Sequence, residues 1–247
     1  MATESFLLPD WPAPDNVKAL STTRVGGCSE SPYASFNLGD HVGDDEQRVL
    51  ANRQYLNKRL GAEVSCQWLQ QVHGIEVIEV SRAGAVIEAD GAVTGQDNLA
   101  CIVMTADCLP VLFCDRAGTR VAAAHAGWRG LASGVLEATV DELQCSPEDL
   151  LCWLGPAIGA SAFEVGPEVR EQFCKQHADS VEAFRVSASG KWLADLYLLA
   201  AVRLKSIGVE AIYGGNFCTY NDPQRFFSYR RDGVTGRMAS LIWLQGR

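Results

Sequence analysis

Apolar residues follow two patterns along this chain, and each pattern predicts a kind of element. Residues 100–105 and 109–114 are short, continuous apolar runs, which are typical of strands buried on both faces. Residues 120–125 form a third run of this kind and predict a third strand. Residues 45–60 carry apolar side chains at helical spacing, and Gly61 is expected to end that helix. The middle of the chain is therefore predicted to be a bundle of buried strands.

Further elements extend this picture over the rest of the chain. We expect strands at residues 68–73, 76–80, 150–154, 211–214, 226–230 and 238–244, and helices at 128–143, 167–177 and 193–207. Clustered strands with interspersed helices, without strict alternation, favour an α+β fold. No repeat, low-complexity tract or linker interrupts the sequence, so we expect a single domain over residues 1–247.

Composition and charge narrow the possible partners. The net charge of −9 argues against a nucleic-acid partner, because affinity for phosphate backbones depends on Lys and Arg contacts. No apolar run approaches the roughly 18 residues of a membrane span, and the first residues do not resemble a signal peptide. We expect a cytoplasmic protein with a small-molecule substrate; the sequence leaves its oligomeric state open. The nine cysteines are odd in number and include no Cys-x-x-Cys pair, so a disulfide framework or a structural zinc ribbon is not expected.

Three residues stand where predicted strands end. His73 follows one strand, Cys108 separates two buried runs, and His125 closes a third run just before a helix. Two imidazoles and a thiolate suit zinc, and three protein ligands leave the open position of a catalytic site. Copper accepts the same donors. Spacing alone also fits a cysteine that only packs in the core and histidines that only occupy turns. Asp107 weighs against this alternative, since a carboxylate in an apolar stretch needs a partner.

The segment His125-Ala-Gly-Trp-Arg-Gly places Arg129 where a strand turns into a helix. Main-chain N–H groups at such a turn favour an anion, which predicts a phosphate site, although the glycines also fit tight packing of strand against helix. Arg24 and Arg230 lie in other predicted loops or strand ends and are further candidates for substrate binding. Glu164 follows the loop at residues 155–159, which is a candidate wall of a pocket.

Several long motifs together resemble one known family. They are Gln71-Val-His-Gly, Thr105-Ala-Asp-Cys-Leu-Pro-Val, His125-Ala-Gly-Trp-Arg-Gly, Gly155-Pro-Ala-Ile-Gly, Phe163-Glu-Val-Gly, Arg231-Asp and Gly236-Arg-Met-Ala. In these motifs the chain is similar to the laccase-domain proteins, also called polyphenol oxidases or multicopper polyphenol oxidoreductases, whose bacterial members are also named peptidoglycan editing factors. The resemblance runs from Ser21-Thr-Thr-Arg to the last predicted strand.

The resemblance implies a fold, a metal site and an activity. The implied fold is a sandwich of mixed β-sheets flanked by helices, of α/β/β/α type, and the family's zinc ligands correspond to His73, Cys108 and His125. The implied activity is phosphorolysis of adenosine, inosine, guanosine and methylthioadenosine, together with adenosine deamination. For deamination we expect Asp107, and after it Glu164, to move protons, and for phosphorolysis we expect Arg129, together with Arg24 or Arg230, to hold phosphate.

Two alternative enzymes remain open at this stage, and a non-enzymatic metal-binding or partner-binding protein is a third alternative. The family name suggests a copper-dependent polyphenol oxidase, but the chain has four histidines and a trinuclear copper cluster needs more once three ligands are assigned. A cysteine hydrolase is the second alternative, with Cys108 as nucleophile and a histidine as base, acting on peptidoglycan precursors that contain a wrongly built muramyl-serine.

Overall fold

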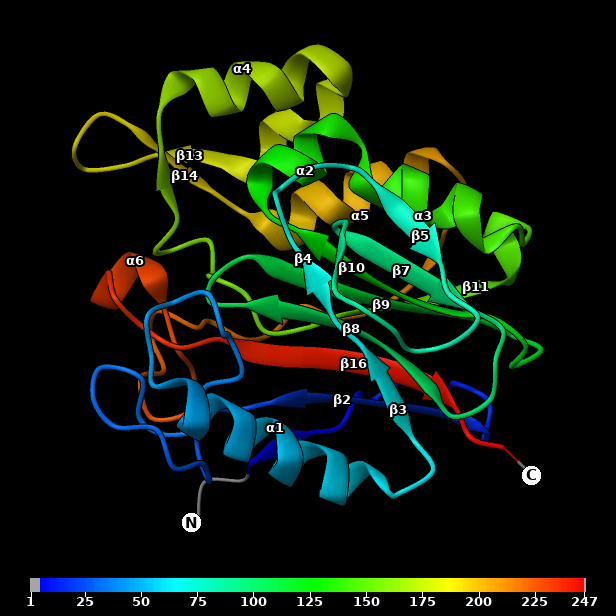
Figure 1. Cartoon of the computed structure of the whole chain (residues 1–247). Coiled ribbons are helices and arrows are strands. Elements are labelled where there is room, and N and C mark those ends of the chain that lie inside the picture. The colour runs from blue at the N-terminus through cyan, green and yellow to red at the C-terminus, as the bar shows by residue number, and fades with distance from the viewer. Residues whose placement is uncertain (1–4, 247) are drawn as a thin grey trace.

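Two large β-sheets pack face to face, and helices cover both outer faces (Figure 1). The computed structural model describes residues 5–246, so the expected domain of 1–247 is described between these bounds. Side chains of both sheets interlock between the layers, among them Val103 and Ile242 from one sheet and Leu112 and Ala123 from the other. The α+β class and the α/β/β/α layering are confirmed.

The first sheet has five strands in the order β1-β2-β16-β8-β3. These are β1 (Phe6–Leu7), β2 (Val17–Thr22), β16 (Met238–Leu244), β8 (Leu99–Thr105) and β3 (Ser65–Gln67). The strand β16 pairs antiparallel with β2 and β8, and β3 adds a parallel edge to β8. Every residue of β8 and β16 is buried, which explains their continuous apolar runs.

The second sheet has six strands in the order β15-β11-β9-β10-β7-β5. These are β15 (Ala211–Gly214), β11 (Leu150–Leu154), β9 (Leu109–Asp115), β10 (Val121–Ala126), β7 (Gly91–Thr94) and β5 (Val77–Glu79). Its central strands are antiparallel, while β15 and β5 pair in parallel at the two edges. Two small sheets complete the fold: β12 (Glu164–Val165), β14 (Trp192–Ala194) and β13 (Phe184–Val186), and β4 (Leu69–Gln70) with β6 (Ile87–Glu88).

The helices cover the two sheets with their apolar faces. Leu56 of α1 (Glu46–Leu60) packs with Leu20 and Ile102 on the outer face of the first sheet. The second sheet is covered by α2 (Trp128–Ser133), α3 (Val135–Leu143), α4 (Pro167–Gln176) and α5 (Leu196–Ser206). Two 3₁₀ helices at Pro147–Asp149 and Ala178–Ala183 and the short α6 (Tyr229–Asp232) complete the helices.

Some predicted elements differ from the structure. The helix expected at residues 128–143 is two helices, because Gly134 has φ 110° and interrupts the helical backbone. The helix expected from residue 193 begins at Leu196, where the Asp195 carboxylate accepts hydrogen bonds from the amides of Tyr197 and Leu198.

The strand predicted at residues 226–230 does not exist. Phe226 and Phe227 bury their rings beside Ala106 and Met238 in a small apolar cluster, and α6 follows directly. Both edges of β16 are already paired with β2 and β8, so no edge of that strand remains for the predicted hairpin.

Candidate metal centre

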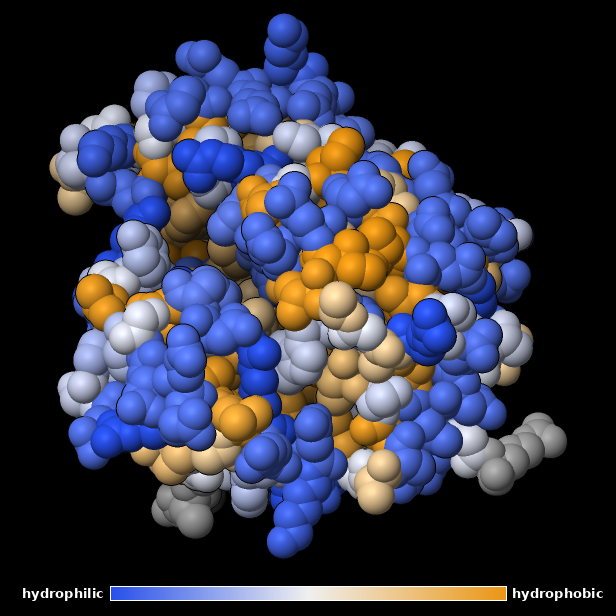
Figure 2. Space-filling model, viewed as in Figure 1, coloured by the Kyte–Doolittle hydropathy of each residue, from blue (hydrophilic) through white to orange (hydrophobic). Residues whose placement is uncertain are grey.

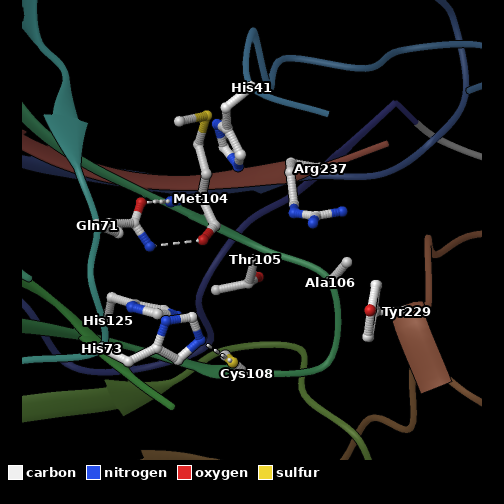
Figure 3. Close-up of a pocket in the computed structure, with 10 residues that line it drawn as sticks. All are labelled: His41, Gln71, His73, Met104, Thr105, Ala106, Cys108, His125, Tyr229 and Arg237. Carbon is white, nitrogen blue, oxygen red and sulfur yellow. Dashed lines mark hydrogen bonds between the residues drawn. The ribbon is translucent and has the colours of Figure 1, made fainter. Parts of the chain in front are cut away.

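The three predicted ligands converge where the chain passes from one sheet to the other. Cys108 ends the short turn between β8 of the first sheet and β9 of the second. His125 lies on β10 opposite Pro110 of β9, and His73 lies in the loop between β4 and β5. Figure 3 shows the three side chains pointing toward one another at one side of a pocket. The convergence expected from the sequence is confirmed.

The geometry of these donors fits a single metal ion. The nearest donor atoms of the three side chains all lie within 4.8 Å of one another, and His73 Nε2 is 3.7 Å from Cys108 Sγ. Zinc bonds of about 2.3 Å to sulfur and 2.0–2.1 Å to nitrogen, at tetrahedral angles, separate two such donors by roughly 3.5 Å. The group could therefore hold a metal ion with small side-chain adjustments, and three ligands leave a position open toward the pocket.

Asp90 is a buried part of this centre that the sequence reasoning missed. Its carboxylate accepts hydrogen bonds from His125 Nδ1 at 2.8 Å and from the amides of Val72, His73 and Gly74 at 3.2, 3.0 and 2.6 Å. Burial raises the pKa of Asp90, but the hydrogen bond and charge of His125 and the hydrogen bonds from the Gly74 and Val72 amides outweigh burial and lower the pKa, so the carboxylate stays ionised.

Asp90 determines how both histidines are presented. An ionised carboxylate only accepts hydrogen bonds, so Nδ1 of His125 carries the proton and Nε2 is left for a metal. The same carboxylate fixes the loop in which His73 adopts a left-handed backbone with φ 61°. The sequence did contain a signal for Asp90, because this carboxylate directly precedes the buried strand β7. Asp107 was identified by a similar signal, a carboxylate in an apolar stretch.

Two glycines after His125 allow the histidine loop to pack closely. A Cβ atom at Gly127 would lie 2.7 Å from His73 Cδ2 and 3.1 Å from Cys108 Sγ. A Cβ atom at Gly130 would lie 2.7 Å from the carbonyl oxygen of Gly74. These contacts favour the packing role of the glycines, one of the two interpretations left open by the sequence.

Cys108 and His125 shift each other's pKa in opposite directions. Burial raises the pKa of the Cys108 thiol, but the charge and hydrogen bond of His125 and the hydrogen bond of His73 outweigh it and lower the pKa to about 6. Burial lowers the pKa of His125, while Cys108 and Asp90 raise it to about 9. By contrast, burial raises the pKa of Cys66 and of Cys114 to about 12. Cys108 is thus prepared to act as a thiolate ligand.

The donors open into a cavity of about 370 Å³. Small-molecule sites have volumes of roughly 300–1,000 Å³, so the cavity suits a small substrate. Its lining comprises His41, Gln71, His73, Met104, Thr105, Ala106, Cys108, His125, Tyr229 and Arg237 (Figure 3). The Gln71 amide bonds both main-chain polar atoms of Met104, at 2.7 and 2.8 Å, and so ties the loop before His73 to β8. Among these residues, the sequence reasoning assigned no role to His41, Tyr229 or Arg237, although Arg237 lies within a recognised motif.

Asp107 and Glu164 do not line the cavity. Asp107 has φ 95°, and its two carboxylate oxygens accept hydrogen bonds from Thr219 Oγ1 at 2.6 Å and from the amide of Arg230 at 2.7 Å. Glu164 accepts a hydrogen bond from Ser189 at 2.7 Å, on the β13–β14 side of the molecule. Their roles in proton transfer stay predictions.

The three arginines expected to bind substrate also lie outside the lining of this cavity. Arg24 donates to the carbonyl oxygens of Ala34 and Pro223. Arg230 donates to the carbonyl oxygen of Glu164, and Arg129 is exposed, with its guanidinium over the ring of Trp128. The structure does not bring these arginines together, and their role in substrate binding stays a prediction.

The surface around the site is mixed in character. Figure 2 shows apolar surface over the region of β4 and β5, where Val72, Ile75 and Ile87 are exposed.

Within residues 5–246, no helix combines the length and the apolar character that crossing a membrane requires.

Comparison with known proteins places this architecture in a family. A family model described as multi-copper polyphenol oxidoreductase laccase matches residues 18–245. A purine nucleoside phosphorylase of Pseudomonas aeruginosa is 56% identical over 242 residues, covering 98% of this chain and 99% of the relative. The purine nucleoside phosphorylase YfiH of Escherichia coli is 53% identical over 240 residues, covering 97% and 98%.

Solved structures have the same fold over the whole chain. A Neisseria meningitidis protein has a TM-score of 0.95 and 53% identity, covering 98% of this chain and all of that one. YlmD from Geobacillus stearothermophilus has a TM-score of 0.89 and 31% identity, covering 100% and 98%. The resemblance inferred from the motifs is thereby confirmed, and the chain belongs to the multi-copper polyphenol oxidoreductase laccase family.

Proposed function

We propose that this protein is a zinc-dependent purine nucleoside enzyme that cleaves adenosine, inosine, guanosine and methylthioadenosine by phosphorolysis and also deaminates adenosine. The observation that carries the proposal is a group of three donors, His73, Cys108 and His125, that opens into a cavity of small-molecule size. The relatives named purine nucleoside phosphorylases support the substrate class.

Phosphorolysis exchanges one bond at the ribose. A phosphate oxygen forms a bond to C1′, the bond from C1′ to purine N9 breaks, and its electron pair leaves with the purine. The proton that monohydrogen phosphate gives up balances the proton that the purine takes, so inosine yields hypoxanthine and ribose 1-phosphate. The enzyme must hold both substrates close together and exclude water, because water at C1′ would give free ribose instead.

The residues of the centre have distinct parts in this proposal. His73, Cys108 and His125 would hold the zinc ion, which would supply a positive charge that orients and polarises a polar group of the nucleoside or a water molecule. Asp90 orients His125 and the loop of His73, and Gln71 fixes that loop to β8. The exposed ring of Tyr229 lies at the cavity, where a purine base can stack on it.

Deamination of adenosine in the same cavity needs a group that moves protons. Water adds at purine C6, ammonia leaves, and inosine forms; a carboxylate is the usual proton carrier in such reactions. Asp107 remains our first candidate and Glu164 the second. Replacing Asp107 with Asn is expected to lower the deamination rate by about 10²- to 10⁴-fold if the carboxylate carries the proton. An unchanged rate would remove Asp107 from this role.

A copper-dependent polyphenol oxidase is a weaker proposal, despite the family's description. A multicopper mechanism needs several metal sites, and the described residues contain one group of three or more suitable donors. One copper ion bound at His73, Cys108 and His125 would leave the other copper ions of such a mechanism without ligands.

A cysteine hydrolase acting on peptidoglycan precursors is favoured by one observation, the lowered pKa of Cys108 beside His125. Metal content distinguishes this candidate from the zinc enzyme. A hydrolase that uses a free thiolate is expected to be active without metal and to be inhibited by zinc, whereas the proposed phosphorylase loses activity when zinc is removed.

The experiment combines elemental analysis with a product assay. The freshly purified protein is expected to contain about one zinc per chain and to convert inosine and phosphate to hypoxanthine and ribose 1-phosphate. Treatment with a strong chelator should abolish turnover, and added zinc should restore it. A zinc-loaded protein that releases neither hypoxanthine from inosine nor inosine from adenosine would contradict the proposal.

A further inference from the structure

Arg237 lines the cavity, and within residues 5–246 no acidic side chain forms an ion pair with it, unlike six other arginines. Arg48, Arg53, Arg120, Arg203, Arg225 and Arg231 each form an ion pair with an acidic side chain. The only hydrogen bonds of the Arg237 guanidinium within residues 5–246 run from Nη1 to the carbonyl oxygens of Thr235 and Gly236, at 3.0 and 3.1 Å. Its Nε and Nη2 donors therefore remain available in the wall of the cavity.

This guanidinium is half-buried, so an unbalanced charge there is costly. Burial lowers the pKa of Arg237, while the negative charges of Cys108 and Asp107 act in the opposite direction. An arginine stays protonated in proteins, so a positive charge faces the cavity at neutral pH. A partly buried cation with open donors is the arrangement expected of an anion site.

His41 is a second donor beside Arg237. Figure 3 shows both side chains on the side of the cavity away from the metal ligands, with Thr105 between Arg237 and Cys108. His41 Nδ1 is 3.5 Å from Asp40 Oδ1, and the other oxygen of Asp40 pairs with Arg53 at 3.2 Å. Burial and the charge of Arg237 lower the pKa of His41, while the hydrogen bond and charge of Asp40 raise it. A proton on Nε2, the ring nitrogen that does not face Asp40, lets His41 donate to an anion.

A buried asparagine locks the two segments that carry these donors. Asn37 Oδ1 accepts from the amides of Gly39 and Arg237 at 3.0 and 2.8 Å, and its Nδ2 donates to Asp44 at 2.9 Å. Gly39 leaves room for the arginine, because a Cβ atom there would lie 2.8 Å from Arg237 Cγ. Asn37 therefore holds the loop of His41 and the segment of Arg237 together, so the positions of both donors are fixed relative to each other.

We propose that Arg237 and His41 form an oxyanion subsite that holds inorganic phosphate on the cavity wall across from His73, Cys108 and His125. The assignment rests on the phosphorolysis proposed above. The planar guanidinium offers two adjacent donors that match two phosphate oxygens, and His41 adds a third. A nucleoside in the cavity lies between this phosphate and the metal ligands. Arg24 and Arg230 are less suitable, since neither side chain lines this cavity.

The test measures phosphate binding and turnover in the zinc-loaded enzyme. Arg237→Met removes the guanidinium group but keeps the aliphatic part of the side chain that packs against Gly39. The hydrogen bond that the amide of residue 237 donates to Asn37 does not depend on the side chain. We expect the calorimetric Kd for inorganic phosphate, and its KM in phosphorolysis, to rise about ten- to hundredfold, as the loss of charge-assisted hydrogen bonds implies. The KM for inosine should change less than about twofold.

Three further variants sharpen the result. His41→Asn is expected to raise the KM for phosphate by a smaller factor than Arg237→Met. Arg237→Lys keeps the positive charge but lacks the paired donors of the guanidinium group, so its KM for phosphate should lie between those of the wild type and Arg237→Met. Arg185→Met is the matched control, because it removes one exposed arginine on β13 and should leave phosphate binding unchanged. If Arg237→Met fails to fold, Arg237→Lys and His41→Asn still carry the test.

The outcomes separate this subsite from the proposed function. Turnover of inosine with an unchanged KM for phosphate in Arg237→Met would overturn the subsite and leave phosphorolysis intact. Phosphate that binds the wild type and is lost from Arg237→Met, without any turnover of nucleosides, would support an oxyanion site and contradict phosphorolysis. Phosphate binding that persists in Arg237→Met and disappears with zinc would place the anion at the metal and overturn the subsite.

Discussion

The two sides of the cavity are built in different ways. The metal side consists of His73, Cys108 and His125 with Asp90 behind them, and the loop side consists of His41, Tyr229 and Arg237. On the metal side His73 is exposed and Cys108 half-buried, but Asp90 is fully buried and His125 is 3% exposed, whereas on the loop side Tyr229 is 62% exposed.

This difference separates two tasks of an active site. The donors of the metal side are fixed by strand ends and by the hydrogen bonds of Asp90, so their geometry is set before any ligand arrives. The loop side keeps donors and an aromatic ring open to the cavity, so its contacts are completed by a ligand. We infer that the metal side determines the chemistry and the loop side the choice of substrate.

Replacement of Cys108 is expected to have the largest effect. Cys108→Ser removes the thiolate, so zinc content and turnover should fall by more than the roughly 10- to 100-fold that loss of a residue behind a metal ligand costs. Elemental analysis and the hypoxanthine assay measure both. Cys28→Ser is the control, because Cys28 is exposed and far along the chain from the ligands. Full activity in Cys108→Ser with zinc retained would contradict the inference that the metal side determines the chemistry.

Asp90→Asn should have the next largest effect. An amide cannot accept all four hydrogen bonds of this carboxylate, so we expect zinc affinity to fall about 10- to 100-fold and the free energy of unfolding to fall by about 3–5 kcal/mol. Competition with a chelator and denaturant unfolding measure the two quantities.

Asp115→Asn is the matched control for that variant. Asp115 is also buried, but it is the last residue of β9, and its carboxylate accepts hydrogen bonds from Thr119 and Arg120 before β10. The Asp115→Asn protein should have a lower free energy of unfolding and an unchanged affinity for zinc. An equal loss of zinc affinity in both variants would mean that Asp90 acts only through the stability of the fold.

A change on the loop side should be smaller and should affect substrate binding. Tyr229→Ala is expected to raise the KM for inosine by about tenfold with little change in kcat, since stacking of a base on an aromatic ring contributes roughly 1–3 kcal/mol. Tyr229→Phe should keep the wild-type KM. A large fall in kcat for Tyr229→Ala, with KM unchanged, would contradict the assignment of substrate choice to this side.

Glu164→Gln should have the smallest effect. The Glu164 carboxylate bonds Ser189 and lies 3.5 Å from Lys191, outside both sides of the cavity. We expect kcat and KM for deamination and phosphorolysis to change less than about twofold. A fall in the deamination rate of about 10²-fold or more would identify Glu164 as the proton carrier and place a third region at the active site.

The apolar patterns predicted most of the central strands, because burial on both faces leaves a continuous apolar run. The predictions at residues 150–154, 211–214 and 238–244 agree with β11, β15 and β16. The same reasoning failed at residues 226–230, since Phe226 and Phe227 are apolar for a reason other than strand pairing. The strand β7 (GAVT) was missed, because its glycine and threonine ends leave an apolar run of only two residues.

The sequence by itself identified the three candidate donors and the family. Long motifs around His73, Cys108 and His125 were specific enough for both, because donor chemistry belongs to the residues themselves. Only the tertiary structure decided which other groups share the site. Asp90, His41 and Arg237 are far apart in the chain, and their roles depend on distances of a few ångströms that the crossing between two sheets creates. Local patterns do not record such distances, because long-range packing of the two sheets determines them.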